Sequence, residues 1–246
     1  MKKYLLTFIT ATLFTPAYAD QGRGPQVYTR DSVVFNRTFA DWSAAWRQWA
    51  DSMPAMKHPL FDTASCSEGN SGPVWFLGGR FCAADVNQNC VNLPVVRTCE
   101  VPQGVTLYFP VLNSGCLDGE AAAGQCSPEP NAPSAGPFIS QMRKAVADGI
   151  DQTTGLQVTV DGKRINGNLK KDFRVQSTVY TSLVPEGSLY PAIFEPNIVK
   201  GTYVGVDDGI YVMLKPLKKG SHTLNFKGSF PQWDFDLDFT YNLIVK

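Results

Sequence analysis

Beyond its first nineteen residues the sequence lacks any hydrophobic run of the ~20 residues that a membrane-spanning helix needs. The apolar run at the start, Tyr4 to Phe14, is about half that length. It follows two lysines and precedes Ala17 to Ala19, a small-x-small cleavage site, which is the pattern of a secretory signal peptide. Residues 1–19 are therefore predicted to be removed before Asp20. The mature chain is expected in the periplasm or the medium, with no transmembrane anchor.

A surplus of positive charge is also missing. The chain has 22 basic and 22 acidic side chains, and loss of the two signal lysines leaves 20 basic against 22 acidic, spread without blocks. Nucleic acids and anionic membranes are bound through basic patches. Neither is therefore an expected partner.

The common catalytic and cofactor motifs are absent, namely G-x-S-x-G, H-E-x-x-H, a phosphate-binding loop and any C-x-x-C pair. Histidine is scarce, with His58 and His222 alone. His222 alternates in phase with Leu224 and Phe226, which favours a hydrogen-bonded histidine at the core edge over a metal ligand or a base. His58 precedes Pro59, which favours a loop position. The sequence predicts no metal and no other cofactor.

Acidic residues form no recognisable site either. Asp234 and Asp238 share a face of the predicted last strand about 13 Å apart, too far to share a calcium ion. Asp207 and Asp208 could supply loop ligands, but Asp-Asp-Gly is equally typical of a turn, so calcium stays a minor hypothesis. Carboxylates for glycoside hydrolysis need a separation of roughly 5 to 10 Å, which sequence spacing in a β protein does not fix.

Cysteine is present in an even number, which in an exported protein indicates disulfides. The six residues are Cys66, Cys82, Cys90, Cys99, Cys116 and Cys126. Six cysteines allow fifteen pairings. Proximity in sequence favours Cys82 with Cys90 and Cys116 with Cys126, which leaves Cys66 for Cys99.

Two helices are predicted. Thr38 and Asp41 form a capping box for a first helix that runs roughly from Phe39 to Met53, where a proline follows. Its apolar side chains fall within an arc of about 80° and are expected to pack against a sheet: Phe39, Trp42, Trp46, Trp49 and Met53. Its polar side chains occupy the opposite side: Asp41, Arg47, Gln48 and Asp51. A second helix is expected from Pro137 to about Asp148, with Gly149 ending it and one apolar face: Ile139, Met142 and Val146.

Most of the remaining chain alternates as strands do, between Gly and Pro punctuation. Expected strands lie within 72–79, 96–112, 156–167, 173–184, 209–217, 221–228 and 235–245. Asp161-Gly162 is the strongest hairpin signal, and the last segment buries every second residue from Phe235 to Val245. The fold predicted for residues 20–246 is a single mainly β domain, a disulfide-stapled antiparallel β-sandwich, jelly-roll-like, with two packed helices.

Four sequence blocks following the tryptophan-rich helix carry a resemblance. They are GPVWFLGG, VPQGVTLYFPVLN, DDGIYVMLKPLKKGSHTLNF and DFTYNLIV. Together they span most of the mature chain and resemble the recurring blocks of a family of uncharacterised exported bacterial proteins. The resemblance implies secretion and a β-rich body, and carries over no activity and no catalytic residues.

Two long segments, 113–133 and 185–197, resist assignment to helices or strands, and long loops are often functional. Three aromatic residues in irregular sequence are candidates for ligand binding: Tyr190, Phe194 and Trp233. Packing of these residues onto the sandwich is the alternative. We predict an exported, non-catalytic protein that binds an extracellular or envelope ligand, carbohydrate or protein, through long loops. The alternatives are a secreted hydrolase, with glycoside cleavage first to test, and a structural or interaction protein.

Overall fold

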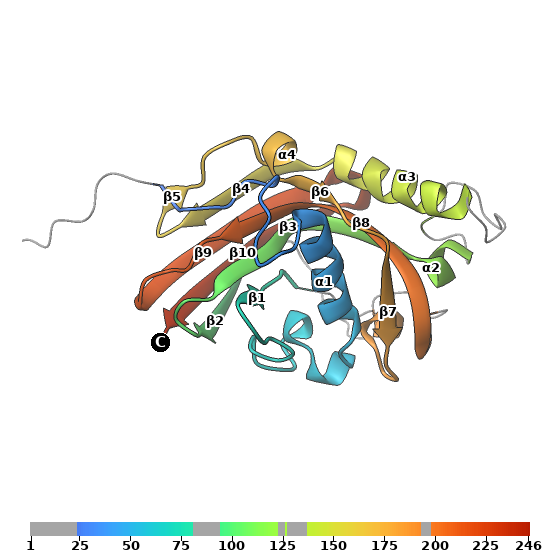
Figure 1. Ribbon diagram of the computed structural model, residues 1–246, viewed down its shortest axis with the longest axis horizontal. Coiled ribbons are helices and arrows are strands. Elements are labelled where there is room, and N and C mark those ends of the chain that lie inside the picture. Colours follow the sequence, from blue (N-terminus) through green and yellow to red (C-terminus); the bar gives the residue numbers. More distant parts are fainter. Residues whose placement is uncertain (1–23, 81–93, 123–125, 127–136, 193–197) are drawn as a thin grey trace, which may run out of the picture.

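Two five-stranded β-sheets pack face to face and form the body of the protein (Figure 1), as the alternating segments of the sequence predict. The computed structural model describes residues 24–80, 94–122, 126, 137–192 and 198–246. The predicted signal peptide lies outside these residues. Within them, no helix is long and apolar enough to cross a membrane.

The first sheet has the strand order β1-β3-β8-β6, and β7 pairs with another part of β8. Its strands are β1 (Val74–Phe76), β3 (Thr106–Leu117), β6 (Arg174–Gln176), β7 (Tyr180–Val184) and β8 (Gly201–Leu214). β8 is antiparallel to its three partners, whereas the edge strand β1 is parallel to β3. A register shift in β3 lets both Val111 and Leu112 join the core between the sheets.

The second sheet has the strand order β2-β10-β9-β4-β5. Its strands are β2 (Val95–Val101), β4 (Thr154–Val160), β5 (Lys163–Arg164), β9 (Gly220–Phe230) and β10 (Phe235–Val245). The edge strand β2 is parallel to β10, and the other pairs are antiparallel. Asp161 and Gly162 between β4 and β5 have φ angles of 51° and 74°, as a two-residue type I′ turn requires. The predicted hairpin is confirmed.

Apolar side chains from both sheets meet in one core. In β10 every second residue from Phe239 to Val245 is buried, which confirms the predicted alternation. These side chains pack with residues from the first sheet: Leu107, Phe109, Ile210, Val212 and Leu214. The sandwich therefore buries one face of each sheet.

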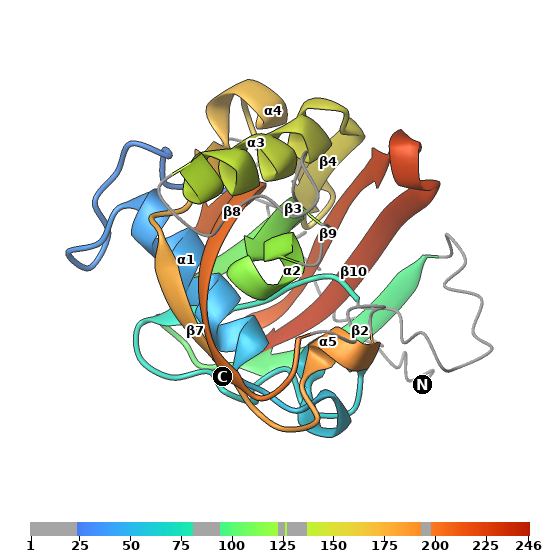
Figure 2. The ribbon, with the colours of Figure 1, turned by 90° about the vertical axis from the view of Figure 1, so that its right-hand side faces the viewer.

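Helix α1 (Phe39–Asp51) covers the opposite face of the first sheet, away from β9 and β10 (Figure 2). Its capping box is present, since Thr38 Oγ1 accepts from Asp41 N and Thr38 N donates to the Asp41 carboxylate. The predicted apolar stripe packs on Tyr108, Tyr211 and Met213 of the sheet: Phe39, Trp42, Trp46, Trp49 and Met53. The inward orientation of the stripe is thereby confirmed.

Helix α3 (Pro137–Asp151) packs on the ends of β3 and β8 and continues past Gly149, where the sequence predicted its end. A Cβ atom at position 149 would lie 2.9 Å from the ring of Trp233. Glycine therefore permits close packing there and does not stop the helix. The buried face of α3 consists of Phe138, Met142, Val146 and Ile150, and Ile139 is partly buried at its border.

The two segments predicted as long loops contain regular structure. β3 runs to Leu117 and leads into α2 (Asp118–Ala122), and α5 (Leu189–Ala192) lies within the second segment. The remaining short elements are α4 (Leu169–Asp172) and the 3₁₀ turns η1 (Ala55–Lys57), η2 (Pro59–Phe61) and η3 (Pro231–Trp233). Regular structure therefore extends into both segments that the sequence left unassigned.

Two of the predicted disulfides are present, Cys66–Cys99 and Cys116–Cys126. The first joins the loop before β1 to β2, and the second lies at the end of β3. The predicted Cys82–Cys90 pair falls outside the described residues. Disulfides persist in oxidising compartments, so these two bonds indicate an oxidising environment outside the cytosol.

Trp46 lies at the centre of the α1 stripe, is 2% exposed and donates its indole N–H to Leu77 O at 2.7 Å. We expect Trp46→Ala to lower the free energy of unfolding by about 3 to 5 kcal/mol, because it leaves a cavity and an unpaired carbonyl. Chemical denaturation measures this loss. Met56→Ala, at a side chain that is 84% exposed, is the control and should change stability by less than about 0.5 kcal/mol. Equal midpoints for both variants would contradict the packing described.

Peptide mapping without reduction should recover three cross-linked pairs, 66 with 99, 116 with 126 and 82 with 90. The first two follow from the structure, and the third follows from sequence proximity and export. A peptide joining Cys66 to any other cysteine, or a free thiol in the exported protein, would contradict this pairing.

Candidate functional site

A groove of about 620 Å³ opens where the edge strands of the two sheets meet. β1 contributes Trp75, the loop before β1 contributes Asp62 and residues 64–67, and the chain end contributes Lys246. β2 and the turn after it contribute Arg97, Thr98, Glu100, Val101 and Pro102. The volume lies in the range of small-molecule sites.

The groove follows the outer edge of β2. Successive strand residues point to opposite faces of a sheet. Both Arg97 and Val101, which are at least partly buried, and Thr98 and Glu100, which are exposed, line the groove. β2 is also the last strand of its sheet. A ligand in the groove would therefore lie along this edge and beside the loop that faces it.

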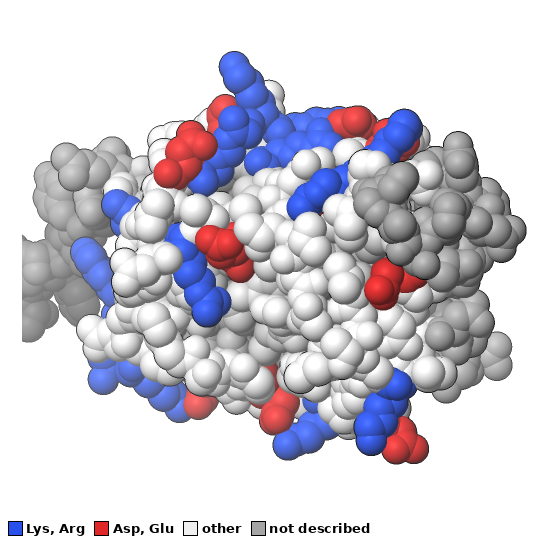
Figure 3. Space-filling model, turned by 45° about the vertical axis from the view of Figure 1, so that its right-hand side comes forward, with Lys and Arg blue, Asp and Glu red and all other residues white. Residues whose placement is uncertain are grey.

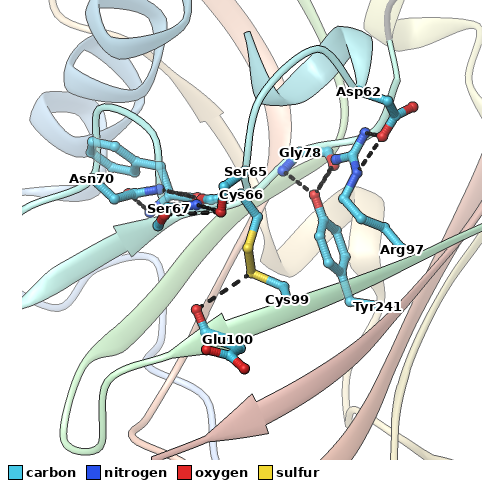
Figure 4. The surroundings of a disulfide bond; sticks show 11 residues. Asp62, Ser65, Cys66, Ser67, Asn70, Gly78, Arg97, Cys99, Glu100 and Tyr241 are labelled. Atoms are coloured by element: carbon cyan, nitrogen blue, oxygen red, sulfur yellow. Dashed lines mark hydrogen bonds and ion pairs between the residues drawn. A yellow bond between two sulfur atoms is a disulfide. The ribbon is translucent and has the colours of Figure 1, made fainter. Parts of the chain in front are cut away.

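The loop at residues 62–70, which forms the opposite wall, is held at three points (Figure 4). The Cys66–Cys99 disulfide joins it to β2. Asn70 accepts from Phe76 N and donates to the carbonyls of Phe76 and Cys66, which joins the loop to β1. The ion pair of Asp62 with Arg97 is the third link. This wall is consequently a built surface, with its backbone fixed to both sheets.

Arg97 is central to that wall. Its Nε and Nη2 lie 2.7 and 2.6 Å from Asp62 Oδ1, and Nη1 donates to Tyr241 Oη at 2.7 Å (Figure 4). The guanidinium also lies 4.7 Å from the ring centroid of Phe239, a cation–π contact. Tyr241 in turn donates to Gly78 O at 2.6 Å. Burial raises the pKa of Tyr241, which keeps this donor protonated.

The charges lining the groove neutralise one another. Arg97 pairs with Asp62, and Lys246 pairs with Glu100 at 2.6 Å. The face of the molecule in Figure 3 is similar in character, with basic and acidic side chains scattered around a largely uncharged centre. The charged side chains that line the groove are thus balanced in pairs.

Trp75 differs from the tryptophans of α1. Trp42, Trp46 and Trp49 each donate their indole N–H to a backbone carbonyl, at 2.9, 2.7 and 3.1 Å. Trp75 is 8% exposed, and its indole N–H has no hydrogen-bond partner among the described residues. A buried donor without an acceptor costs free energy. Trp75 therefore lines the groove while its indole N–H, buried beneath the surface, has no hydrogen-bond partner among the described residues.

A second cluster of polar side chains lies under α1, away from the groove. Arg47 and Asp51 were placed on the polar side of the helix by their sequence positions, yet they are 7% and 0% exposed. This is a correction to the amphipathic pattern. The second side of α1 is covered by α5 and β7, whose Tyr190 and Ser182 both donate to the Asp51 carboxylate. Arg47 contacts Asp51 at 3.2 Å and Asp207 at 4.0 Å.

Asp207 and Asp208 lie inside β8 and are fully buried, so neither the turn nor the loop-ligand interpretation of Asp-Asp-Gly is right. Asp207 faces α1, where it accepts from Asn113 and Tyr211. Asp208 faces the other way and pairs with Arg174 at 2.9 Å. Burial raises the pKa of Asp207 to about 7, against the opposing effects of Arg47 and the two hydrogen bonds.

The predicted ligand-binding aromatics are not brought together. Tyr190 is 1% exposed and bonds to Arg47 and Asp51, so it offers no surface to a ligand. Trp233 is 56% exposed and stands on α3 and Phe230, away from the groove lining. Phe194 lies outside the described residues. Neither Trp75 nor Arg97 was predicted from the sequence as a groove residue. The position of Arg97, in phase with the inward-facing apolar residues of β2, is a sequence signal that could have singled it out.

The histidines have structural partners. His222 bonds to Asp161 and to Lys218 O at 2.8 Å each, as expected for a satisfied histidine at the core edge. Its hydrogen bonds raise its pKa against the effect of partial burial. His58 lies in the loop between η1 and η2, as predicted, and its side chain is fully buried. Across the described part of the chain, no group of three or more His, Cys, Asp or Glu side chains could hold a metal ion.

Comparisons with known proteins identify no family for this chain. No protein-family model matches the chain, and no curated protein matches it. Among solved structures the chain is similar to the solution structure of amebosin, with a TM-score of 0.19 and 11% identity. That match covers 62% of this chain and 96% of amebosin. A TM-score this low supports no argument about fold or function.

We expect the contribution of Asp207 to the free energy of unfolding to fall as the pH rises from about 4 to about 7. Its pKa is raised in the folded state, so folding binds a proton in this range, and that contribution is complete below pH 3.8 and lost above pH 7. Asp207→Asn should remove this slope, which is worth up to about 4 kcal/mol if the full shift is realised. Urea denaturation between pH 4 and 8 measures it. An unchanged slope in the variant would contradict the assignment.

Proposed function

We propose that this protein is an exported, non-catalytic carbohydrate-binding protein, and that the groove along β2 holds a neutral saccharide. The single observation that carries the proposal is that Trp75, whose buried indole N–H has no partner among the described residues, lines that groove. The atoms that cover this donor would have to move before a ligand hydroxyl could reach it, and the new hydrogen bond would then remove the cost of leaving it unpaired. The two disulfides support export, and the resemblance to exported bacterial proteins implies it too.

The chemistry of the groove favours a neutral sugar. Its charged residues are already paired, so binding an ionic ligand would require breaking the Asp62–Arg97 or the Glu100–Lys246 pair. The hydroxyls of Ser65, Ser67 and Thr98 stand among apolar side chains: Ala64, Trp75, Val101 and Pro102. Alternation of hydroxyl groups with apolar surface complements a sugar ring, which has hydroxyls at its rim and C–H groups on its faces.

A hydrolase is the less favoured alternative. The acids that lie close together, Asp51 and Asp207, are fully buried and share Arg47. The acids in the groove lining, Asp62 and Glu100, each have a basic partner. A general acid or a nucleophile needs access to the substrate and a pKa suited to its role. Geometry therefore supports binding over cleavage.

The test uses a panel of neutral oligosaccharides, maltotriose, cellotriose and chitotriose, with trigalacturonate as the anionic comparison. We expect one neutral trisaccharide to bind in calorimetric titration, and Trp75→Phe to weaken that binding about three- to tenfold, because one hydrogen bond is lost. The bound trisaccharide should remain uncleaved after long incubation with the protein.

Trp233→Phe is the matched control, because Trp233 is exposed and lies outside the groove lining. It should leave the affinity unchanged, and the thermal midpoint of Trp75→Phe should show that this variant is folded. Binding lost in Trp233→Phe and kept in Trp75→Phe would place the site elsewhere. Binding of peptides but of no saccharide would instead support a protein partner.

A further inference from the structure

The wall of the groove depends on a buried histidine at the end of α1. His58 is 0% exposed and stands between the last turn of α1 and η2, which leads directly to Asp62. We propose that neutral His58 is a pH-sensitive latch that holds Asp62 against Arg97, and that protonation of His58 opens this wall and weakens ligand binding. The effect on affinity rests on the proposed function, whereas the latch itself does not.

Both ring nitrogens of His58 have partners that require the neutral imidazole. Leu60 N donates to Nδ1 at 3.1 Å, so Nδ1 must be an acceptor. Nε2 lies 2.8 Å from Ala50 O, which can accept only, so Nε2 carries the proton. These two bonds fix one tautomer. A second proton could enter only at Nδ1, where it would face the N–H of Leu60.

The Nδ1 bond is the N-cap of η2, and Asp62 is the C-cap of the same turn. Asp62 has a φ of 58°, an uncommon conformation for a residue other than glycine, and its N–H donates to Pro59 O. Thr63 closes the turn on the His58 backbone, since His58 N donates to Thr63 Oγ1 and Thr63 N donates to His58 O. Loss of the N-cap bond from His58 would therefore disturb the conformation of Asp62, the residue that contacts Arg97.

Groups from three elements of the described chain lie around His58. From α1 it faces the carbonyl of Ala50, the ring of Trp49 at 6.3 Å and the charge of Asp51. From β2 it faces the charge of Arg97, and from its own turn the ring of Phe61 at 5.5 Å. Asp51 favours the imidazolium, but it is already paired with Arg47. Burial, with Arg97 adding to it, lowers the pKa of His58.

Protonation of His58 destabilises the folded protein, because its pKa is lower in the folded state. A histidine with a lowered pKa in the folded state contributes stability that is present above its unfolded pKa of 6.5 and is lost as the pH falls. Asp207 acts oppositely in the same acidic range, since protonation stabilises its folded form. The two effects are separable by variants.

The matched variants are His58→Asn and His222→Asn, since the chain has two histidines. An asparagine at position 58 can cap η2 with its Oδ1, in place of Nδ1, and does not titrate. Affinity for the trisaccharide that binds best in the panel is measured from pH 7.5 to 4.5. In the wild type and in His222→Asn it should fall about tenfold per pH unit below the pKa of His58. In His58→Asn it should stay constant.

Nuclear magnetic resonance tests the latch without any ligand. The Leu60 amide and the Arg97 Nε–H of the wild type should shift with the midpoint at which the His58 ring titrates. If these chemical shifts do not change with the His58 titration, the latch is wrong. A pH-dependent affinity that persists in His58→Asn would also overturn it. If no saccharide binds but both signals follow His58, the latch stands and the proposed function fails. The wild-type titration also decides the matter if His58→Asn does not fold.

Discussion

Two adjacent carboxylates inside β8 set the arrangement of most of the structure. Asp207 and Asp208 are fully buried, and a buried charge costs several kcal/mol unless it is paired and hydrogen-bonded. Neighbouring strand residues point to opposite faces, so each of the two carboxyl groups takes its own cationic partner on its own side of the sheet. Arg47 of α1 supplies one, and Arg174 of β6 supplies the other while also bonding Ala147 O of α3. The positions of α1 and α3 across the sheet are thereby linked.

The placement of α1 has consequences as far as the groove. The aromatic stripe and the Arg47 contact together hold the helix on the sheet, and with it the carbonyl of Ala50, which binds His58. His58 caps the turn that ends at Asp62, and Asp62 meets Arg97 on the other sheet. A continuous series of polar contacts therefore connects the buried cluster in the first sheet with the edge of the second. The Cys66–Cys99 disulfide reinforces its last step.

Local signals in the sequence predicted the elements well. The period of two in β10, the Asp161-Gly162 turn and the Thr38 capping box each depend on residues close together in the chain. The inward packing of the α1 stripe and the Cys116–Cys126 bond, which joins cysteines 10 residues apart, were predictable for the same reason. Cys66–Cys99 spans 33 residues and was predicted as the pair left over.

What the sequence could not predict is non-local. An amphipathic pattern assigns Arg47 and Asp51 to the solvent, because it does not include the chain segments near Ser182 and Tyr190 that cover them. Asp-Asp-Gly is typical of turns unless basic partners from distant segments allow it to be buried. The groove is also built from segments far apart in the sequence, since its residues come from the loop before β1, from β2 and from Lys246.

The groove is a consequence of how the chain changes sheets. β2 and β3 are consecutive strands, yet β2 belongs to the second sheet and β3 to the first, so the turn between them crosses the sandwich. Lys246 bonds to the start of this crossing, since its N donates to Val101 O and its O accepts from Gln103 N. The sandwich cannot close fully where a strand leaves one sheet for the other, and β1 and β2 remain as edges there. A ligand in this opening would contact both sheets and the loop that joins them, so its binding energy would add to the contacts that hold the two sheets together.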